Sequence, residues 1–261
     1  MSKIISYSLF GSRTTPKEQR FVFYAYLRGF VWNVKMNAIV YPDFQTHVEV
    51  DSGTFSDYDN IFYGLKEYYG ISFGINNEQP LCQSMLWRLK PVFFESSEIV
   101  LCRDADALTS HREAQCVQEW LKTEYTILSI KDNPAHTLPL MGGMIGICSK
   151  SMRETYGSWN NLLKFAQVDF DARGSDQDFM MKEIYPKFKN ILLKDMQSVA
   201  INNPSSYATT TPALYCSNLC SAFIGAAGVN DLETIRYFLQ YGRRTGFDEI
   251  ENRYKEIFYW K

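Results

Sequence analysis

Two aspartates separated by one residue, Asp104 and Asp106, are the side chains of this sequence best suited to chemistry. They directly follow an apolar stretch, residues 98–103, which has the pattern of a buried strand. At the end of such a strand, two carboxylates at this spacing can face one hard cation. Mg²⁺ and Mn²⁺ prefer oxygen ligands and leave coordination positions for water and phosphate oxygens. The spacing therefore indicates a divalent-cation site, although two acids that simply occupy a turn give the same short pattern.

Strand and helix patterns alternate along the chain and must position this motif. Strands are predicted at residues 4–10, 38–41, 47–50, 98–103, 125–130, 144–148 and 191–193. Helices are predicted at residues 21–32, 55–69, 79–90, 110–122, 151–166 and 175–184. This alternation is typical of a mostly parallel α/β sheet flanked by helices, in which ligands bind beyond the carboxyl ends of the strands. Asp51, Asp104 and Asp132 each follow a strand candidate, so we expect them to converge on one site.

The composition is that of an ordinary folded domain without a strong charge bias. Among 261 residues, 27 basic and 29 acidic side chains give a formal net charge of -2, which does not favour nucleic acid as a partner. No apolar run approaches the ~18 residues that a membrane-spanning helix needs, so no transmembrane segment is expected. The six cysteines include no CxxC pair. This spacing favours reduced thiols in a cytoplasmic protein, and it disfavours a zinc site at Cys216 and Cys220.

Several segments, taken in order, resemble the metal-dependent glycosyltransferases of the GT-A fold that use nucleotide sugars, particularly short bacterial and viral members. Residues 4–11 and 39–51 resemble the segments around the nucleotide, and residues 85–93 the helix that brings an arginine beside it. Residues 103–106 match the DxD signature of the family. Residues 131–144 resemble the loop on the sugar side, and residues 174–178 a late element that contains the letters DQ.

The resemblance implies a GT-A-like, Rossmann-like single domain over residues 1–261. Its nucleotide-binding half is expected at about residues 1–108 and its acceptor and catalytic half at about 109–261. The implied activity is transfer of a sugar from a nucleoside-diphosphate donor, with a UDP-sugar as the default, to a glycan or another hydroxyl acceptor. Mn²⁺ or Mg²⁺ is the implied cofactor, with Asp104 and Asp106 as its ligands. No third metal ligand is evident near the carboxyl end.

The resemblance also implies which residues contact the nucleotide sugar. They are Tyr7, Ser8, Asp51, Arg88, Arg103, Asp104, Ala105, Asp132, His136, Gly142 and Gly143. Three of these assignments have equally simple alternatives. Arg103 can instead form an ion pair with one of the neighbouring acids, His136 can be structural, and the glycine pair can be a plain turn before a strand.

Asp176 and Asp178 are the candidate catalytic residues. Inverting transfer needs a carboxylate that accepts a proton from the acceptor hydroxyl, and the family resemblance makes Asp176 the first choice and Asp178 the second. In a retaining enzyme Asp176 would instead position the donor or the acceptor. Acids at the start of a helix are also favoured by capping and by the helix dipole alone, so the position does not by itself establish a catalytic role.

Two other functions fit parts of the pattern. A haloacid-dehalogenase-like phosphatase also ends a strand with two aspartates, but here Leu108 stands where that class usually has Thr or Val, and the motif is not on the first strand. A non-catalytic module that binds nucleotide sugars would not need Asp176.

The aromatic residues, 15 % of the chain, divide between two expected roles. Tyr7 and Tyr41 lie near the proposed nucleotide loops, where a ring can stack on a base. The loop at residues 202–211 and the aromatic tail, with Phe258, are expected to meet the acceptor. The remaining rings that we assign are expected in the core; these are Phe21, Phe23, Phe62, Phe93 and Phe179.

Overall fold

The strands form one mixed sheet with the order β3-β2-β1-β4-β6-β5-β7. The computed structural model describes residues 2–131, 138–165, 169–172, 174–188, 190–195 and 247–258. The strands are β1 (Ser2–Leu9), β2 (Phe44–Asp51), β3 (Ser72–Asn76), β4 (Ser97–Arg103), β5 (Ile127–Lys131), β6 (Met144–Cys148) and β7 (Ile191–Asp195). β6 runs antiparallel to β4 and β5, and the other neighbouring pairs are parallel. The predicted mostly parallel α/β sheet is confirmed.

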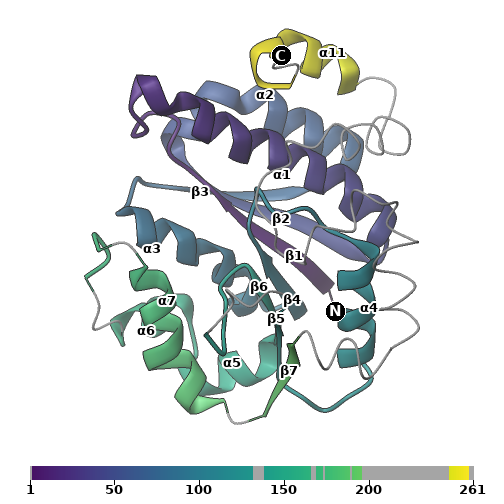
Figure 1. The fold of residues 1–261 in the computed structure, drawn as a ribbon, viewed down its shortest axis with the longest axis vertical. Helices are drawn as coiled ribbons and strands as arrows, with labels where there is room; N and C mark the ends of the chain where they lie inside the picture. The colour runs from purple at the N-terminus through teal and green to yellow at the C-terminus, as the bar shows by residue number, and fades with distance from the viewer. Residues whose placement is uncertain are drawn as a thin grey trace.

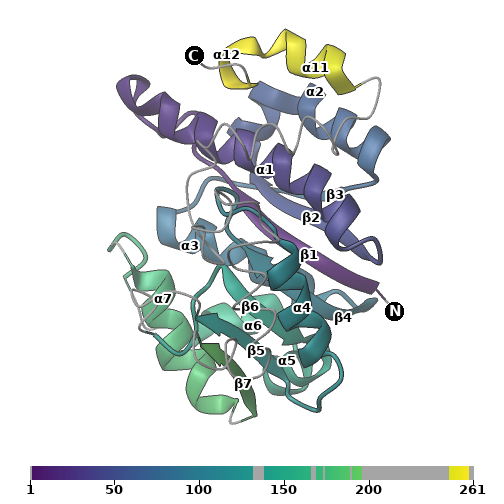
Figure 2. The same cartoon turned by 45° about the vertical axis from the view of Figure 1, so that its right-hand side comes forward.

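Helices cover both faces of this sheet (Figure 1). On one face lie α1 (Arg20–Val40), α2 (Ser52–Tyr69), α4 (His111–Trp120), α11 (Phe247–Arg253) and α12 (Lys255–Phe258). On the other lie the 3-10 segment η2 (Leu86–Phe93), α5 (Ser149–Tyr156), α6 (Trp159–Lys164), α7 (Ser175–Phe179) and the π-helical turn η3 (Met180–Ile184). The short helices α3 (Leu81–Met85), η1 (Lys17–Gln19) and η4 (Tyr185–Lys187) complete the described elements. The turned view in Figure 2 shows the same two layers.

The alternation of side chains along β1 explains why two apolar layers form. Ile5, Tyr7 and Leu9 point to the face that α1 and α2 cover, whereas Ile4 belongs to the opposite cluster. Successive residues of a strand point to opposite faces, so a central strand that is apolar on both sides must be covered on both. The helix ends also follow the sequence, since α2 stops at Gly70, whose φ of 67° is the left-handed conformation that glycine adopts readily.

Three local predictions were wrong. Residues 38–41, predicted as a strand, are the end of α1 and its cap, because the helix continues to Val40 and the Tyr41 N–H donates to the Asn37 carbonyl. The edge strand β3 was not predicted, since its five residues contain only two apolar side chains, Phe73 and Ile75, and this alternation is too short to stand out. Phe21, predicted in the core, is 57 % exposed at the start of α1. Phe23, Phe62 and Phe179 are buried as predicted.

The end of the chain packs on the layer of α1 and α2. Lys35 on α1 forms an ion pair with Glu251 on α11 at 2.5 Å, and both side chains are buried. Phe258 is buried in the same layer, which removes its ring from the acceptor role expected for it. Residues 202–211, also expected to meet the acceptor, lie outside the described residues, as do Cys216 and Cys220. Among the helices that the structure describes, none combines the length and apolar character needed to cross a membrane.

Candidate active site

Asp104 and Asp106 lie on the turn that follows β4, near the middle of the sheet. The Asp104 side chain is 40 % exposed, and Asp106 is partly buried beside it. Burial, together with the neighbouring carboxylate of Asp104, raises the pKa of Asp106 to about 6. The two carboxylates repel each other when both are ionised, so a positive charge beside the turn is stabilising.

Helix α1 fixes the backbone of this turn. The Asn33 amide nitrogen donates to the carbonyls of Ala105 at 3.0 Å and Ala107 at 2.9 Å, and its oxygen accepts from the Thr109 N–H at 2.9 Å. One turn earlier, Gly29 lies so close to the Ala105 carbonyl that a Cβ would overlap it. Asn33 and Gly29 therefore hold the aspartate turn from beneath, through backbone groups that leave the carboxylates unused.

Arg88, in η2, connects Asp104 with Asp176. Its Nη1 forms an ion pair with Asp104 Oδ1, and its Nη2 lies 3.6 Å from Asp176 Oδ2. The guanidinium is buried, and although burial alone would lower its pKa, the carboxylates of Asp104 and Asp176 raise it. The backbone N–H of Arg88 donates to the Ser8 hydroxyl at 2.8 Å, which ties η2 to β1. The two acids are far apart in the sequence, and Arg88 brings them to one cluster.

Gly142 and Gly143 make room for this cluster just before β6. A Cβ on Gly143 would overlap the Asp104 carboxylate, and one on Gly142 would lie 2.5 Å from Arg88 Nη2. With the Gln177 amide assigned in the orientation that satisfies both of its atoms, its nitrogen donates to the Leu140 carbonyl at 3.1 Å and its oxygen accepts from the Gly142 N–H at 3.1 Å. The two glycines were expected to admit the donor sugar, and in this structure the space beside them holds the side chains of Arg88 and Asp104.

The charges of the cluster fit a divalent cation. Two carboxylates, those of Asp104 and Asp176, pair with the guanidinium of Arg88, and Asp106 lies on the same turn as Asp104, which leaves an excess of two negative charges when all three acids are ionised. Among the described residues no group of three or more His, Cys, Asp or Glu side chains is arranged to hold a metal ion. If a cation binds, Asp104 and Asp106 are the two carboxylates on this turn that could act as its ligands, with the remaining positions left to water and ligand oxygens, as is common for Mg²⁺.

Arg103 does not join this cluster. Its Nε donates to Glu113 Oε1 at 2.6 Å and its Nη1 donates to the carbonyls of Cys102 and Ile145, with only 3 % of the residue exposed. Tyr41 donates from its hydroxyl to the same Glu113 oxygen at 3.0 Å. The expectation that Arg103 contacts the nucleotide sugar is not supported, and neither is its pairing with an acid of the DxD motif. Tyr41 is equally buried and offers no face to a base.

The residues predicted to surround the base and ribose also have structural roles, in core packing and helix capping. Tyr7 is fully buried, with its ring edge-on to Phe30, so the expected contact with the nucleotide is corrected. Asp51 caps α2, accepting from the Thr54 N–H at 2.6 Å, and it also accepts from the Gly11 N–H at 2.7 Å. Its carboxylate thereby fixes the loop after β1 rather than facing an open site.

The remaining predicted site residues differ in whether they lie at the cluster. Asp176 is buried at the start of α7 beside Arg88, as described, whereas Asp178 is exposed and pairs with Lys182 at 3.5 Å. Because Asp178 pairs with Lys182 and forms no ion pair with Arg88 among the described contacts, its assignment as an alternative base is not supported. Ala105 is buried within the aspartate turn. Asp132 and His136 lie outside the described residues.

Sequence reasoning missed Gly29, Asn33 and Gln177. A glycine inside a helical pattern signals close packing, so Gly29 carried a detectable signal, although nothing in the sequence named its partner. Asn33 lies 72 residues before the carbonyl of Ala105 that it binds. Gln177 was visible only as part of the late family element.

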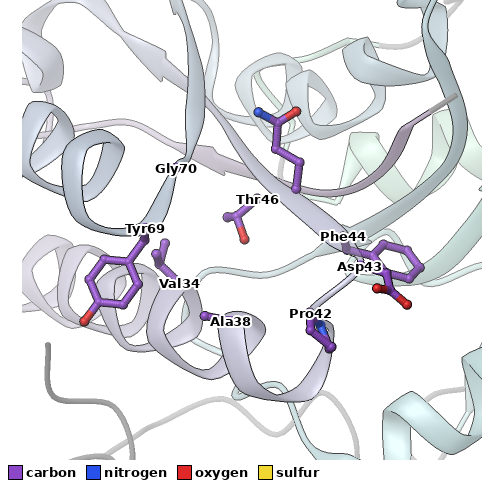
Figure 3. Close-up of a pocket in the computed structure, with 9 residues that line it drawn as sticks. Val34, Ala38, Pro42, Asp43, Phe44, Thr46, Tyr69 and Gly70 are labelled. Atoms are coloured by element: carbon purple, nitrogen blue, oxygen red, sulfur yellow. The ribbon is translucent and has the colours of Figure 1, made fainter.

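A separate pocket of about 300 Å³ opens at the other end of the sheet (Figure 3). It lies where β2 begins and α1 ends. Thr46 of β2 lines it together with Tyr69, the last residue of α2, and Gly70. None of the predicted site residues lines it. Because ligands of parallel sheets bind at the carboxyl ends of the strands, the cluster around Asp104 is the better candidate.

Comparison with known proteins defines the fold. No protein-family model and no curated protein matches the chain. The structure is similar to a crystal structure described as a nucleotide-diphospho-sugar transferase from Desulfovibrio desulfuricans, with a TM-score of 0.50 and 12 % identity over 92 % of this chain and 97 % of that one. This chain is thus a mixed α/β protein whose seven-stranded central sheet, flanked by helices, matches the nucleotide-diphospho-sugar transferase fold.

Two further solved structures give weaker matches. A cytidylyltransferase from Leptospira borgpetersenii has a TM-score of 0.48 at 12 % identity, over 94 % of this chain and 97 % of that one. TarS from S. aureus has a TM-score of 0.46 at 12 % identity, over 95 % of this chain and 74 % of that one.

Proposed function

We propose that this protein is a divalent-cation-dependent glycosyltransferase that moves a sugar from a nucleoside-diphosphate donor to a hydroxyl acceptor. The observation that carries the proposal is the meeting of Asp104, Asp106, Asp176 and Arg88 at the carboxyl end of β4. These residues come from three separate segments, and the fold matched by the chain is that of a nucleotide-diphospho-sugar transferase. The likeness of the sequence to GT-A enzymes supports the same donor class.

The role of the aspartate turn follows from the charge that develops during transfer. As the bond from the sugar to the diphosphate breaks, negative charge builds on the leaving phosphate oxygens. A cation such as Mn²⁺ or Mg²⁺, when bound, stabilises that charge as a Lewis acid. Asp104 and Asp106 would hold this cation. Asn33 and Gly29 would keep the turn in place while the ligands change.

Asp176 is the proposed base of an inverting reaction. It would accept the proton of the acceptor hydroxyl, which in an inverting reaction attacks the sugar from the face opposite the leaving diphosphate, and its ion pair with Arg88 would fix its position. UDP is the proposed nucleotide and a glycan or other hydroxyl compound the proposed acceptor, both supported by the sequence resemblance. A cytoplasmic location is proposed on the cysteine pattern.

The test is release of nucleoside diphosphate from a panel of UDP- and GDP-sugars, with and without Mn²⁺, by the full chain. Asp104→Asn and Asp106→Asn should each abolish Mn²⁺-stimulated release. Glu154→Gln is a matched control, since it also converts an acid to an amide but lies exposed on α5. Near-normal turnover in both aspartate variants would overturn the metal assignment.

Other products of the same assay identify the alternatives. Binding of a nucleotide sugar with neither transfer nor hydrolysis would indicate a non-catalytic module. A phosphorylated aspartate trapped on Asp104 would indicate a phosphatase, and pyrophosphate released from a nucleoside triphosphate would indicate nucleotidyl transfer. At saturating Mn²⁺, Asp176→Asn should keep donor binding and lose transfer, and the reverse pattern would remove Asp176 from catalysis.

A further inference from the structure

The shared guanidinium of Arg88 has a consequence for how a cation enters the site. Among the described residues its ion-pair partners are Asp104 and Asp176. Asp104 is the more exposed partner, with 40 % of its side chain accessible, whereas the Asp176 side chain is 3 % exposed. A cation that arrives from solvent therefore meets an Asp104 carboxylate that already has a positive partner.

We infer that Arg88 takes the place of the cation on Asp104 in the metal-free protein, and that a divalent cation displaces its guanidinium toward Asp176. The inference rests on the proposed metal dependence and adds a positioning residue to it. In this arrangement Arg88 prevents three carboxylates from facing one another without a counter-charge. Once the cation takes over that task at Asp104, the guanidinium is left with Asp176.

Burial makes Asp176 the destination. The Arg88 side chain is 5 % exposed, so it does not reach solvent without a larger rearrangement. A buried charge that loses its partner is strongly destabilising, so the guanidinium must keep a carboxylate. Asp176 Oδ2 is already 3.6 Å from Nη2, beyond a normal hydrogen bond, and a small shift would close this gap. Gly142, which has no side chain beside Nη2, leaves the guanidinium free of a Cβ contact there.

The displacement would link cation binding at Asp104 to the position of the candidate base, Asp176. Metal binding at Asp104 strengthens the contact between Arg88 and Asp176, so the candidate base is fixed only when the cation is present. Arg88 therefore acts through Asp104 and Asp176 without contacting the reacting atoms, as a positioning residue. By linkage, anything that strengthens the contact of Arg88 with Asp176 must also strengthen cation binding.

The first test measures Mn²⁺ affinity by electron paramagnetic resonance, without nucleotide, at fixed pH and ionic strength. Arg88→Met removes the competing charge and should tighten Mn²⁺ binding roughly tenfold, within the usual range of coupling between sites. Arg88→Lys keeps the charge but not the fork that reaches both acids, so its affinity should fall between that of the Arg88→Met variant and that of the wild type. Lys150→Met, which removes an exposed charge on α5, should leave the affinity unchanged. Unchanged or weaker binding in Arg88→Met would overturn the inference.

A double-mutant cycle separates displacement from simple repulsion. If Arg88 moves toward Asp176 when Mn²⁺ binds, Asp176→Asn should weaken Mn²⁺ binding more with Arg88 present than in the Arg88→Met background. If Arg88 stays where it is, its interaction with Asp176 is the same in both states and the two effects add. Additive effects would therefore exclude the displacement.

A third measurement does not depend on the variants folding. A structure of the wild-type protein with Mn²⁺ should show Arg88 Nη1 separated from Asp104 and Nη2 within hydrogen-bond distance of Asp176. Retention of the Arg88–Asp104 ion pair beside bound Mn²⁺ would refute the inference while leaving the proposed function intact. Failure of wild type and both Arg88 variants to bind Mn²⁺ would instead refute the metal dependence, and the displacement with it.

Discussion

Gly29 in the middle of α1 lies directly against the carbonyl oxygen of Ala105, which stands between the two aspartates of the candidate site. No side chain fits between this helix and the aspartate turn at that point, so the turn is positioned by contact with backbone. Asn33, one helical turn later, donates to the same carbonyl at 3.0 Å. The geometry of the carboxylates is thus set by a helix whose residues do not themselves take part in the chemistry.

Gly29→Ala should therefore displace the aspartate turn. Alanine is the better helix former by about 1 kcal/mol, so any loss of stability must come from the new contact. Overpacking of this kind typically costs about 1–3 kcal/mol. We expect lower stability in urea unfolding and weaker Mn²⁺ binding in the same variant.

Gly64→Ala is the matched control for this prediction. Its Cβ would meet the end of the Ile250 side chain, which is able to rotate away, and Gly64 lies on α2 rather than beneath the aspartates. It should affect stability without affecting Mn²⁺ affinity. Wild-type Mn²⁺ affinity in Gly29→Ala would show that the contact with Ala105 does not position the site.

The contrast between Asp104 and Tyr7 shows what local pattern is able to predict. Asp104 and Asp106 were found because an apolar strand followed by acids is a local signal, and the parallel sheet then places them at a ligand-binding edge. The role expected for Tyr7 was wrong because the local sequence does not show whether a tyrosine at the end of a strand is buried in the core or exposed to stack on a base. Its burial is decided by Phe30 on α1 and by the Asn37 side chain, both distant in sequence.

The same limit of local sequence pattern explains why the roles of Arg103 and Arg88 were not distinguished. Both are arginines near carboxylates in the sequence or the fold, and local pattern gives no reason to separate them. In the structure the two side chains point in different directions. Arg103 pairs with Glu113 on α4, and Arg88 pairs with Asp104 at the carboxyl end of β4. Side-chain direction depends on the register of β4 and the path of η2, which spacing alone does not specify.

Asp106 should make the metal-free protein less stable as the pH rises. Its pKa in the folded protein is raised to about 6, above the ordinary value of 3.8. The folded state therefore holds the proton more tightly, and this contribution is fully present below about pH 4 and lost as the pH rises through about 6. A shift of about two units corresponds to at most about 3 kcal/mol. Chemical unfolding at a series of pH values, with a chelator present, measures it.

Asp106→Asn provides the matching variant. It has no proton to lose, so near neutral pH the metal-free variant should be more stable than the wild type, with a difference that shrinks toward pH 4. Added Mn²⁺ should stabilise the wild type and not the variant, because a ligand stabilises only the state that binds it. A stability difference that does not change with pH would show that Asp106 is not the group responsible.

Glu113→Gln should reduce stability without weakening donor binding. Glu113 neutralises Arg103, and loss of one partner of a buried ion pair typically costs about 3–5 kcal/mol. The loss should appear as a lower midpoint of thermal unfolding. Donor affinity of the folded variant should match that of the wild type, because Arg103 points away from Asp104. A large loss of donor affinity with normal stability would indicate that Arg103 takes part in donor binding.

Glu251→Gln should release the end of the chain from the layer of α1 and α2. The substitution leaves Lys35 buried without its counter-ion, at a cost of about 3–5 kcal/mol. Hydrogen exchange should accelerate over residues 247–258, because these helices lose the ion pair that joins them to α1. Glu249→Gln, on the exposed side of the same helix, is the control and should exchange like the wild type. Unchanged exchange in Glu251→Gln would mean that apolar packing around Phe247 and Phe258 holds the segment without the ion pair, since both rings are buried in the same layer.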